Sequence, residues 1–129
     1  MSNFISEIKS NKNKVNLDDR VKNAINDVKK LFLDYSSGLF VFGSTSRGLR
    51  RYDSDIDILL LIPNVEMSGI ECRRFKRKFY NNLWDISSKY DIDFDLKVYG
   101  ELNFKNYCKE FSFESQIYDD LVHVDYLLN

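Results

Sequence analysis

The sequence lacks a long hydrophobic run, an excess of charge of one sign and a set of paired cysteines. Its longest uninterrupted apolar run, Ile58 to Ile62, is far shorter than the roughly 20 residues that a membrane-spanning helix needs. The net charge of -1 gives no overall attraction to nucleic acid, in contrast to a strongly basic domain. Cys72 and Cys108 form no C-x-x-C motif and have only His123 as a histidine companion, so we expect reduced thiols rather than a zinc site.

The N-terminus also lacks the apolar core of a secretory signal peptide, and we therefore expect a cytoplasmic protein. The 129 residues are 43% hydrophobic and 15% aromatic, which suffices for one domain with an ordinary core. We assign this single domain to residues 18–129. Residues 1–17 are rich in Asn, Lys and Ser, and we expect either a mobile arm or a short frayed helix there.

Two stretches show the hydrophobic period of an amphipathic helix. In the first, apolar residues from Val21 to Phe32 recur four, three and four positions apart, and Asp18 precedes them as an N-cap. In the second, a similar stripe runs from Phe75 to Tyr90. We expect the second stripe to cover one face of a sheet.

Three segments have the pattern of strands. They occupy residues 39–42, 54–62 and 90–99. The third alternates with a period of two, which places its acidic side chains on one face and its apolar side chains on the other. Residues 121–127 fit either a strand or the end of a helix. The pattern predicts an α/β (α+β) fold with a small mixed sheet packed against helices.

Two aspartates lie two positions apart in the second predicted strand. Residues at this spacing point to the same side and lie roughly 6.5–7 Å apart, so Asp55 and Asp57 reach one pocket. Two carboxylates this close repel each other, so one pKa is raised in the empty site and both groups ionise when a metal binds. Their hard oxygen ligands favour Mg²⁺ or Mn²⁺.

A glycine-serine pair follows the first predicted strand. Gly43 allows a sharp turn and close approach to a ligand, while Ser44 adds a hydroxyl at the start of an expected short helix, whose free N–H groups suit phosphate oxygens. Arg47, three residues later, reaches the same phosphates or fixes the loop. The segment predicts a seat for a polyphosphate.

The third predicted strand offers a further carboxylate from Asp91, Asp93 or Asp95. A third acid would complete a site for two metals roughly 3.5–4 Å apart. Such a site predicts in-line attack by an acceptor hydroxyl on the α-phosphorus of a nucleoside triphosphate, with pyrophosphate leaving along the glycine-serine loop. One metal would lower the pKa of the hydroxyl, and the third acid would accept its proton.

The G-S-x-x-R-G segment at 43–48, the S-D-I-D segment at 54–57 and the later acidic strand together resemble the minimal nucleotidyltransferase family of the DNA polymerase β superfamily. The resemblance covers about residues 18–105. It implies that Asp55, Asp57 and a third acid are catalytic and bind the metals. Asp95, in the segment that looks most like the family's third-acid strand, is our choice, and Asp93 is the alternative. The residues expected to contact the nucleotide are Gly43, Ser44, Arg47 and Ser54.

The same resemblance implies transfer of a nucleoside monophosphate, most simply AMP from ATP. It also implies a toxin-antitoxin role, in which a partner ribonuclease of the HEPN type is adenylylated and silenced. Two alternatives remain open. One is modification of a small hydroxyl compound such as an aminoglycoside, which would require a homo-oligomer to build the pocket. The other is a noncatalytic module that binds and masks its partner, with nucleotide as a regulator.

A cluster of cations and several aromatic residues each allow a binding role or a purely structural role. The cations are Arg73, Arg74, Lys76, Arg77 and Lys78. One prediction is that they attract RNA or an acidic protein. The other is that they form an ordinary solvated helix face. Tyr52 and Trp84 stack on a base or pack against the core. His123 is expected to be structural or exposed.

Overall fold

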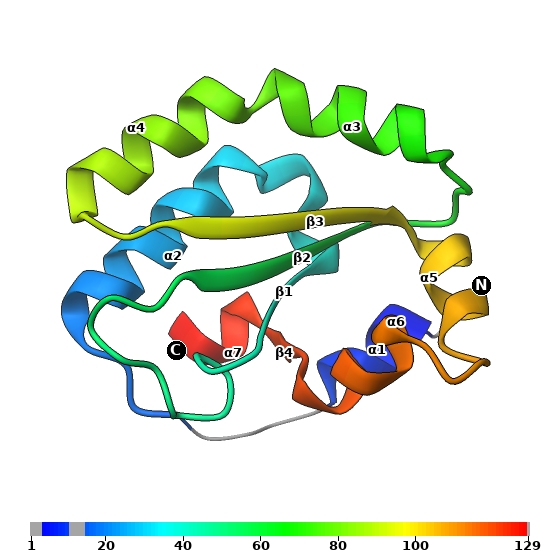
Figure 1. Cartoon of the computed structure of the whole chain (residues 1–129), viewed down its shortest axis with the longest axis horizontal. Helices are drawn as coiled ribbons and strands as arrows, with labels where there is room; N and C mark the ends of the chain where they lie inside the picture. Colours follow the sequence, from blue (N-terminus) through cyan, green and yellow to red (C-terminus); the bar gives the residue numbers. More distant parts are fainter. Residues whose placement is uncertain (1–3, 11–14, 129) are drawn as a thin grey trace.

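The computed structural model describes residues 4–10 and 15–128 and is built around a four-stranded sheet in the order β3-β2-β1-β4 (Figure 1). The strands are β1 (Leu39–Phe42), β2 (Ile56–Ile62), β3 (Phe94–Gly100) and β4 (Val122–His123). β1 is antiparallel to both β2 and β4, whereas β2 and β3 are parallel. The predicted mixed sheet is therefore confirmed.

Helices cover both faces of the sheet and connect the parallel strands. They are α1 (Phe4–Lys9), α2 (Asp19–Leu31), α3 (Gly69–Lys78), α4 (Tyr80–Tyr90), α5 (Glu101–Tyr107), α6 (Phe113–Ile117) and α7 (Val124–Leu128), with the 3-10 helices η1 (Leu33–Gly38) and η2 (Tyr118–Asp120). A parallel pair of strands needs a crossover connection, and α3 and α4 provide it between β2 and β3. They run above β3 in Figure 1.

The first core lies between α2, α4, α7 and one face of the sheet. Asp18 caps α2 by accepting a hydrogen bond from the Val21 N–H at 2.8 Å, as the sequence predicts. The α2 stripe then buries Ile25 and Val28 against alternate β2 residues, of which Ile58 is fully buried. The apolar residues repeat every 3.6 positions on the helix and every two positions on the strand, and the two apolar faces pack together in one layer.

The second core lies on the opposite face of the sheet and includes the N-terminal helix. Phe4 and Ile8 of α1 are buried against a cluster that contains Phe40 of β1 and Phe104 of α5. Of the two alternatives for the N-terminal segment, the structure contains the short helix, with two of its side chains in the core. Residues 1–3 and 11–14 of that segment lie outside the described residues.

Three predicted boundaries are wrong. The helix expected over 75–90 is two helices that meet at Phe79, whose backbone (φ -107°, ψ 3°) is not helical. Its ring packs edge-on against Phe32 with centroids 4.7 Å apart, so the bend keeps aromatic side chains on the core. β2 and β3 also begin later than expected, because Ser54 closes a turn and Asp91 ends α4 with a left-handed φ of 53°.

The remaining expectations concern the C-terminus and the cysteines. Residues 121–127 contain both predicted alternatives, since the short strand β4 leads directly into α7. Cys72 and Cys108 are free thiols, both half-buried. None of the helices in the described ranges is long and apolar enough to cross a membrane.

Candidate active site

Asp57 and Asp95 are direct neighbours across two parallel strands. The register of β2 and β3 pairs the Cα atoms of these two residues, and both side chains lie on the sheet face opposite the α2 core. Asp57 is half-buried and Asp95 is exposed. The structure therefore brings together the central predicted aspartate and the preferred third acid.

Asp55 and the alternative acid Asp93 lie just before these strands. Each precedes its strand by one residue, and the Asp93 carbonyl accepts a hydrogen bond from the Ile56 N–H at 2.9 Å. Both side chains are exposed. Asp55 belongs to the charges that act on Asp57, whereas the third-strand acid acting on it is Asp95. The register therefore places Asp95, and not Asp93, directly beside Asp57, and the choice of the third acid stays a prediction.

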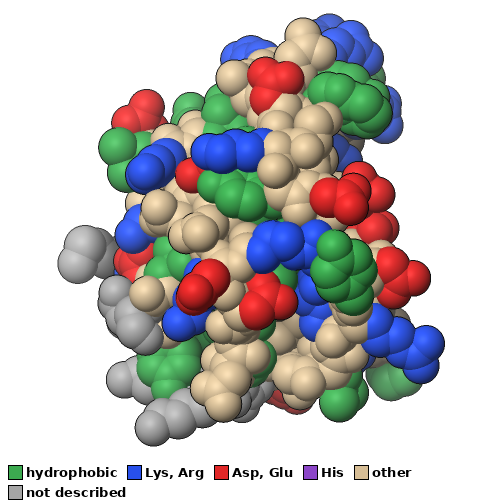
Figure 2. All heavy atoms as spheres, turned by 90° about the vertical axis from the view of Figure 1, so that its left-hand side faces the viewer, with side chains coloured by type: hydrophobic (Ala, Val, Ile, Leu, Met, Phe, Trp, Pro, Cys, Tyr) green, Lys and Arg blue, Asp and Glu red, His purple; other side chains and the backbone are tan. Residues whose placement is uncertain are grey.

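The electrostatics of Asp57 follow from this crowding. Burial raises the pKa of its carboxyl group, and the negative charges of Asp95 and Asp55 raise it further. Lys97 opposes them, and its Nζ lies 3.7 Å from Oδ2 of Asp95. Figure 2 views the end of the molecule at which α4 ends and β3 begins, and Asp and Glu side chains gather along one margin of it.

The carboxylate cluster fits a divalent cation by its chemistry. Its donors are hard carboxylate oxygens. Burial is the largest cause of the raised pKa of Asp57, and the negative charges of Asp95 and Asp55, which a cation would offset, add to it. As the side chains stand, no set of three or more Asp, Glu, His or Cys within the described residues is arranged as a metal site.

The turn after β1 brings the chain against Asp57. Gly43 has a left-handed φ of 72°, and a Cβ at this position would overlap Oδ2 of Asp57. The pairing of Phe42 with Asp57 in the antiparallel β1–β2 ladder sets this approach. Glycine is therefore needed here both for the backbone angle and for the space that the carboxylate occupies.

Residues 43–48 form hydrogen-bonded turns and not the short helix that the sequence suggests. The Gly43 carbonyl accepts bonds from the Arg47 N–H at 3.2 Å and the Ser46 hydroxyl at 3.1 Å. The N–H groups of Ser44, Thr45 and Ser46 donate to no acceptor in the described part of the chain. Successive free N–H groups in a turn make an anion-binding concavity. Thr45 and Ser46 are fully buried, so the half-buried Ser44 is the accessible point of the turn.

Arg47 and Ser54, both expected at the nucleotide, hold loops in this structure. Arg47 donates from Nη1 to Oδ2 of Asp120 at 2.7 Å, which ties the turn to η2. It stays close enough to Asp57 to favour the charged carboxylate. The Ser54 hydroxyl accepts a bond from the Arg51 N–H at 3.0 Å, and its carbonyl accepts one from Arg50 at 2.9 Å. Ser54 thus closes the loop before Asp55.

Three residues near the acids were not singled out from the sequence. Lys97 is two positions after Asp95 and so shares its face, a signal that the period-two pattern already contained. Phe113 lies under it, with Lys97 Nζ 5.5 Å from the ring centroid. Asp120 is the partner of Arg47. Phe113 and Asp120 lie near the site because the C-terminal segment folds back against it. No local sequence pattern reveals this.

Comparisons with known proteins identify the family. A solved structure described as "Crystal structure of the toxin-antitoxin with AMP-PNP" aligns at 23% identity over 67% of this chain and 68% of that chain, with a TM-score of 0.40. A comparison with curated proteins gives no match. The family model described as "Nucleotidyltransferase domain" matches residues 21–122, from α2 to β4. The chain therefore belongs to the nucleotidyltransferase domain family.

Proposed function

We propose that this protein transfers a nucleoside monophosphate, AMP from ATP in the simplest case, to an acceptor hydroxyl. One observation carries the proposal: the carboxylate of Asp57 lies between the Gly43 turn on one side and Asp95 on the other. A seat for phosphate and a cluster of acids are therefore adjacent, as transfer at an α-phosphorus requires.

Divalent ions, Mg²⁺ or Mn²⁺, fit this arrangement as partners of the acids. Asp55, Asp57 and Asp95 would hold them. When bound, such ions neutralise the triphosphate and lower the pKa of an attacking hydroxyl. The half-buried Asp57 is the member held most firmly, because the turn and both neighbouring strands surround it.

The chain's own groups have distinct tasks in the reaction. Gly43 lets the turn approach the triphosphate, and the N–H of Ser44 donates to its oxygens. Asp95, exposed beside Asp57, accepts the proton of the acceptor hydroxyl. The acceptor oxygen then forms a bond to the α-phosphorus while the bond to the β-phosphate oxygen breaks, and pyrophosphate leaves along the turn. Arg47 and Asp120 keep the turn in place through their ion pair.

The acceptor we propose is a hydroxyl on a partner protein, with a HEPN-type ribonuclease toxin as the partner and adenylylation as the antitoxin step. The sequence resemblance to minimal nucleotidyltransferases supports this. Asp55 and Asp95 are also exposed, so a side chain on another macromolecule can reach them without passing through a closed pocket.

The direct test is label transfer. The wild-type protein is incubated with α-labelled ATP, Mg²⁺ and the lysate of a host that carries the partner, beside Asp57→Asn and the control Asp53→Asn. Asp53 is an exposed acid outside the cluster. We expect label on protein with the wild type and the control, and at least about a 100-fold loss with Asp57→Asn. Labelling that survives Asp57→Asn excludes Asp57 from the chemistry.

The same experiment separates the alternatives. Label that appears on a small molecule, with a dimeric enzyme, would support the aminoglycoside-type reaction. Neutralisation of the toxin that persists in Asp57→Asn while labelling is lost would support a binding module. Label on RNA would change the acceptor class but keep the transferase.

A further inference from the structure

The geometry of the site gives a direction from which the acceptor must arrive; this step rests on the proposed function. The Gly43 turn lies on the β1 side of Asp57, and Asp95 lies on its β3 side. In an in-line displacement the attacking and leaving oxygens stand on opposite sides of the phosphorus. If pyrophosphate leaves along the turn, the acceptor approaches across the free edge of β3.

A trough follows that edge. β3 is the outermost strand of the sheet and pairs only with β2 in the described residues. Two adjoining hollows of about 650 and 300 Å³ lie along it, and both include Arg73 and Lys76 in their walls. The larger hollow also includes Asp55 and Asp95. The trough therefore reaches Asp55 and Asp95, two of the three proposed catalytic acids.

The floor of the trough offers free backbone groups. The Asp93 carbonyl faces β2, where it accepts from the Ile56 N–H. In a parallel ladder successive residues face opposite neighbours, so the N–H and C=O groups of Phe94, Leu96 and Val98 point out of the sheet. They have no hydrogen-bond partner among the described residues. At the far end, the Gly100 backbone is already bonded to Cys72, which marks the limit of the open edge.

The wall that α3 and α4 form is positively charged and aromatic, whereas the strand side of the larger hollow carries Asp55, Asp93 and Asp95. Arg73, Lys76 and Arg77 line it from α3, and none of the three has an ion-pair partner in the part of the chain that is described. Tyr80 and Trp84 continue the same helical stripe with exposed fractions of 66% and 62%. The cations favour an anionic ligand. The aromatic rings favour a ligand with apolar groups between its charges.

We propose that an extended acidic peptide segment of the acceptor protein binds in this trough as an added strand along β3. The three free N–H and C=O pairs match the backbone of a strand. A nucleic acid would fit the cations and rings but would leave these backbone groups unpaired. Acidic side chains would face Arg73, Lys76 and Arg77, and a hydroxyl at the end nearest Asp95 would reach the site of transfer.

The test uses the single tryptophan, which lies in the trough, as the reporter. The probe is an N-acetylated peptide of eight residues in which glutamate alternates with valine, and lysine replaces glutamate in the control peptide. Trp84 fluorescence is titrated without nucleotide or metal. We expect saturable binding of the acidic peptide, and binding at least about tenfold weaker for the lysine peptide.

Two modifications distinguish strand pairing from simple charge attraction. N-methylation of the glutamates removes one alternating set of peptide N–H groups, and N-methylation of the valines removes the other. Only one set can face β3, so one methylated peptide should lose at least about tenfold in affinity and the other should bind as before. On the protein, Arg73→Glu with Arg77→Glu should weaken binding about tenfold. The matched pair Arg74→Glu with Lys78→Glu, on α3 but outside the trough lining, should not.

Several results would overturn the proposal. These are no saturable binding up to about 1 mM peptide, equal binding of both methylated peptides, or preference for an oligoadenylate over the peptide with the same charge dependence. A change in Trp84 fluorescence that depends on protein concentration and not on peptide would indicate that a second copy of this chain binds the edge of β3. Because binding is measured without ATP, its failure is separate from a failure of label transfer, and Asp57→Asn should still bind the peptide.

Discussion

At the scale of single residues, stability and the proposed chemistry oppose each other at Asp57. The fold places its carboxylate against the Gly43 turn and beside Asp95. That position suits cation binding, but it disfavours the charged carboxylate when no cation is present. The raised pKa of Asp57 is the measurable sign of this conflict.

Asp57→Asn should therefore stabilise the free protein at pH 7, by less than about 1 kcal/mol because water still screens the carboxylate. The folded pKa lies above the ordinary value of 3.8, so between the two values the folded state binds more protons than the unfolded state. The contribution of Asp57 to wild-type stability thus falls as pH rises from 3.8 through the folded pKa. Urea unfolding at pH 7 and at pH 3.5 should show the gain at the higher pH and its loss at the lower one. A less stable variant at pH 7 would contradict this.

Gly43→Ala should destabilise the protein by about 1–3 kcal/mol and remove label transfer, because the new Cβ would meet Asp57 on a backbone with φ of 72°. Gly48→Ala is the matched control. Gly48 has the same φ, but among the described residues its Cβ would find only Val15 Cγ1, at 3.8 Å. Thermal unfolding and labelling of both variants separate backbone strain from the clash, and equal losses in both would refute the role of the clash.

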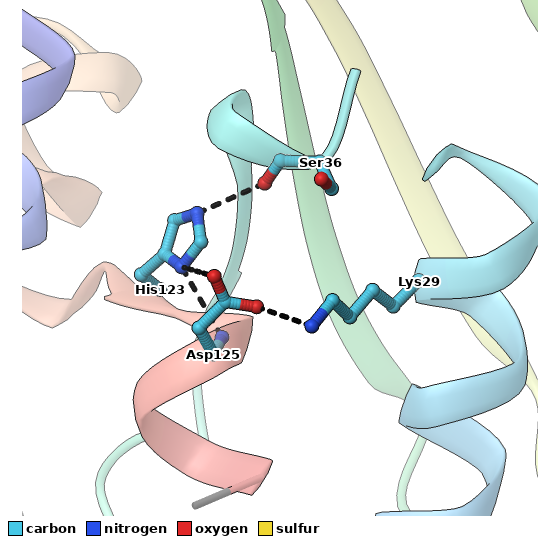
Figure 3. Close-up of polar contacts among 4 residues, drawn as sticks. All are labelled: Lys29, Ser36, His123 and Asp125. Carbon is cyan, nitrogen blue, oxygen red and sulfur yellow. Dashed lines mark hydrogen bonds and ion pairs between the residues drawn. The ribbon is translucent and has the colours of Figure 1, made fainter. Parts of the chain in front are cut away.

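At the scale of elements, a buried histidine joins three segments (Figure 3). His123 of β4 contacts the Ser36 carbonyl of η1 through Nε2 at 2.9 Å, and Nδ1 accepts from the Asp125 N–H at 3.1 Å. Asp125 in turn pairs with Lys29 of α2 at 2.7 Å. An acceptor at Nδ1 and a donor at Nε2 require the neutral ring, and burial lowers the pKa of His123.

Wild-type stability should consequently fall as the pH is lowered from 7 to 5. The unfolded chain takes up the proton near 6.5 while the folded ring resists it, so stability is lost as pH falls. Asp125 attracts the proton and Lys9 repels it, but burial is the largest influence. His123→Gln should cost about 1–2 kcal/mol at pH 7 and flatten the profile, since the chain has one histidine. Chemical unfolding at pH 7, 6 and 5 checks this; identical slopes in both proteins would rule it out.

The N-terminal helix gives a second prediction at this scale. Ile8 is 1% exposed in the second core, so Ile8→Ala should cost about 2–4 kcal/mol. Leu33, 64% exposed, provides the control, and Leu33→Ala should change stability by less than about 0.5 kcal/mol. Urea unfolding of both variants would reveal a detachable arm if Ile8→Ala were as mild as the control.

At the scale of the whole molecule, ligand binding should appear as added stability. A nonhydrolysable ATP analogue with Mg²⁺, at about 100 times its dissociation constant, should add about 2.7 kcal/mol and raise the melting temperature by on the order of 10 °C. EDTA in place of Mg²⁺, or Asp57→Asn, should remove most of the shift. Thermal scans measure the shift for the wild type with Mg²⁺, the wild type with EDTA and Asp57→Asn. An equal shift in all three would show that nucleotide binding does not depend on the acids.

Local patterns predicted much of the fold and the arrangement of the acids. The α2 stripe, the buried strand β1 and the position of Asp57 and Asp95 on the sheet face opposite α2 follow from patterns within a few residues. Boundaries were less predictable. The bend at Phe79 packs against Phe32, and the turn after Gly43 lies against Asp57 and pairs with Asp120. These partners are distant in the chain.

The sequence by itself determined which side chains share a face, because backbone geometry repeats over two to four residues. Only the tertiary structure decided which faces meet: that Asp57 stands beside Asp95 and against Gly43, that Arg47 pairs with Asp120, and that no described strand pairs with the outer edge of β3. These relations depend on strand order and register, which are set by the burial of two apolar cores over the whole chain.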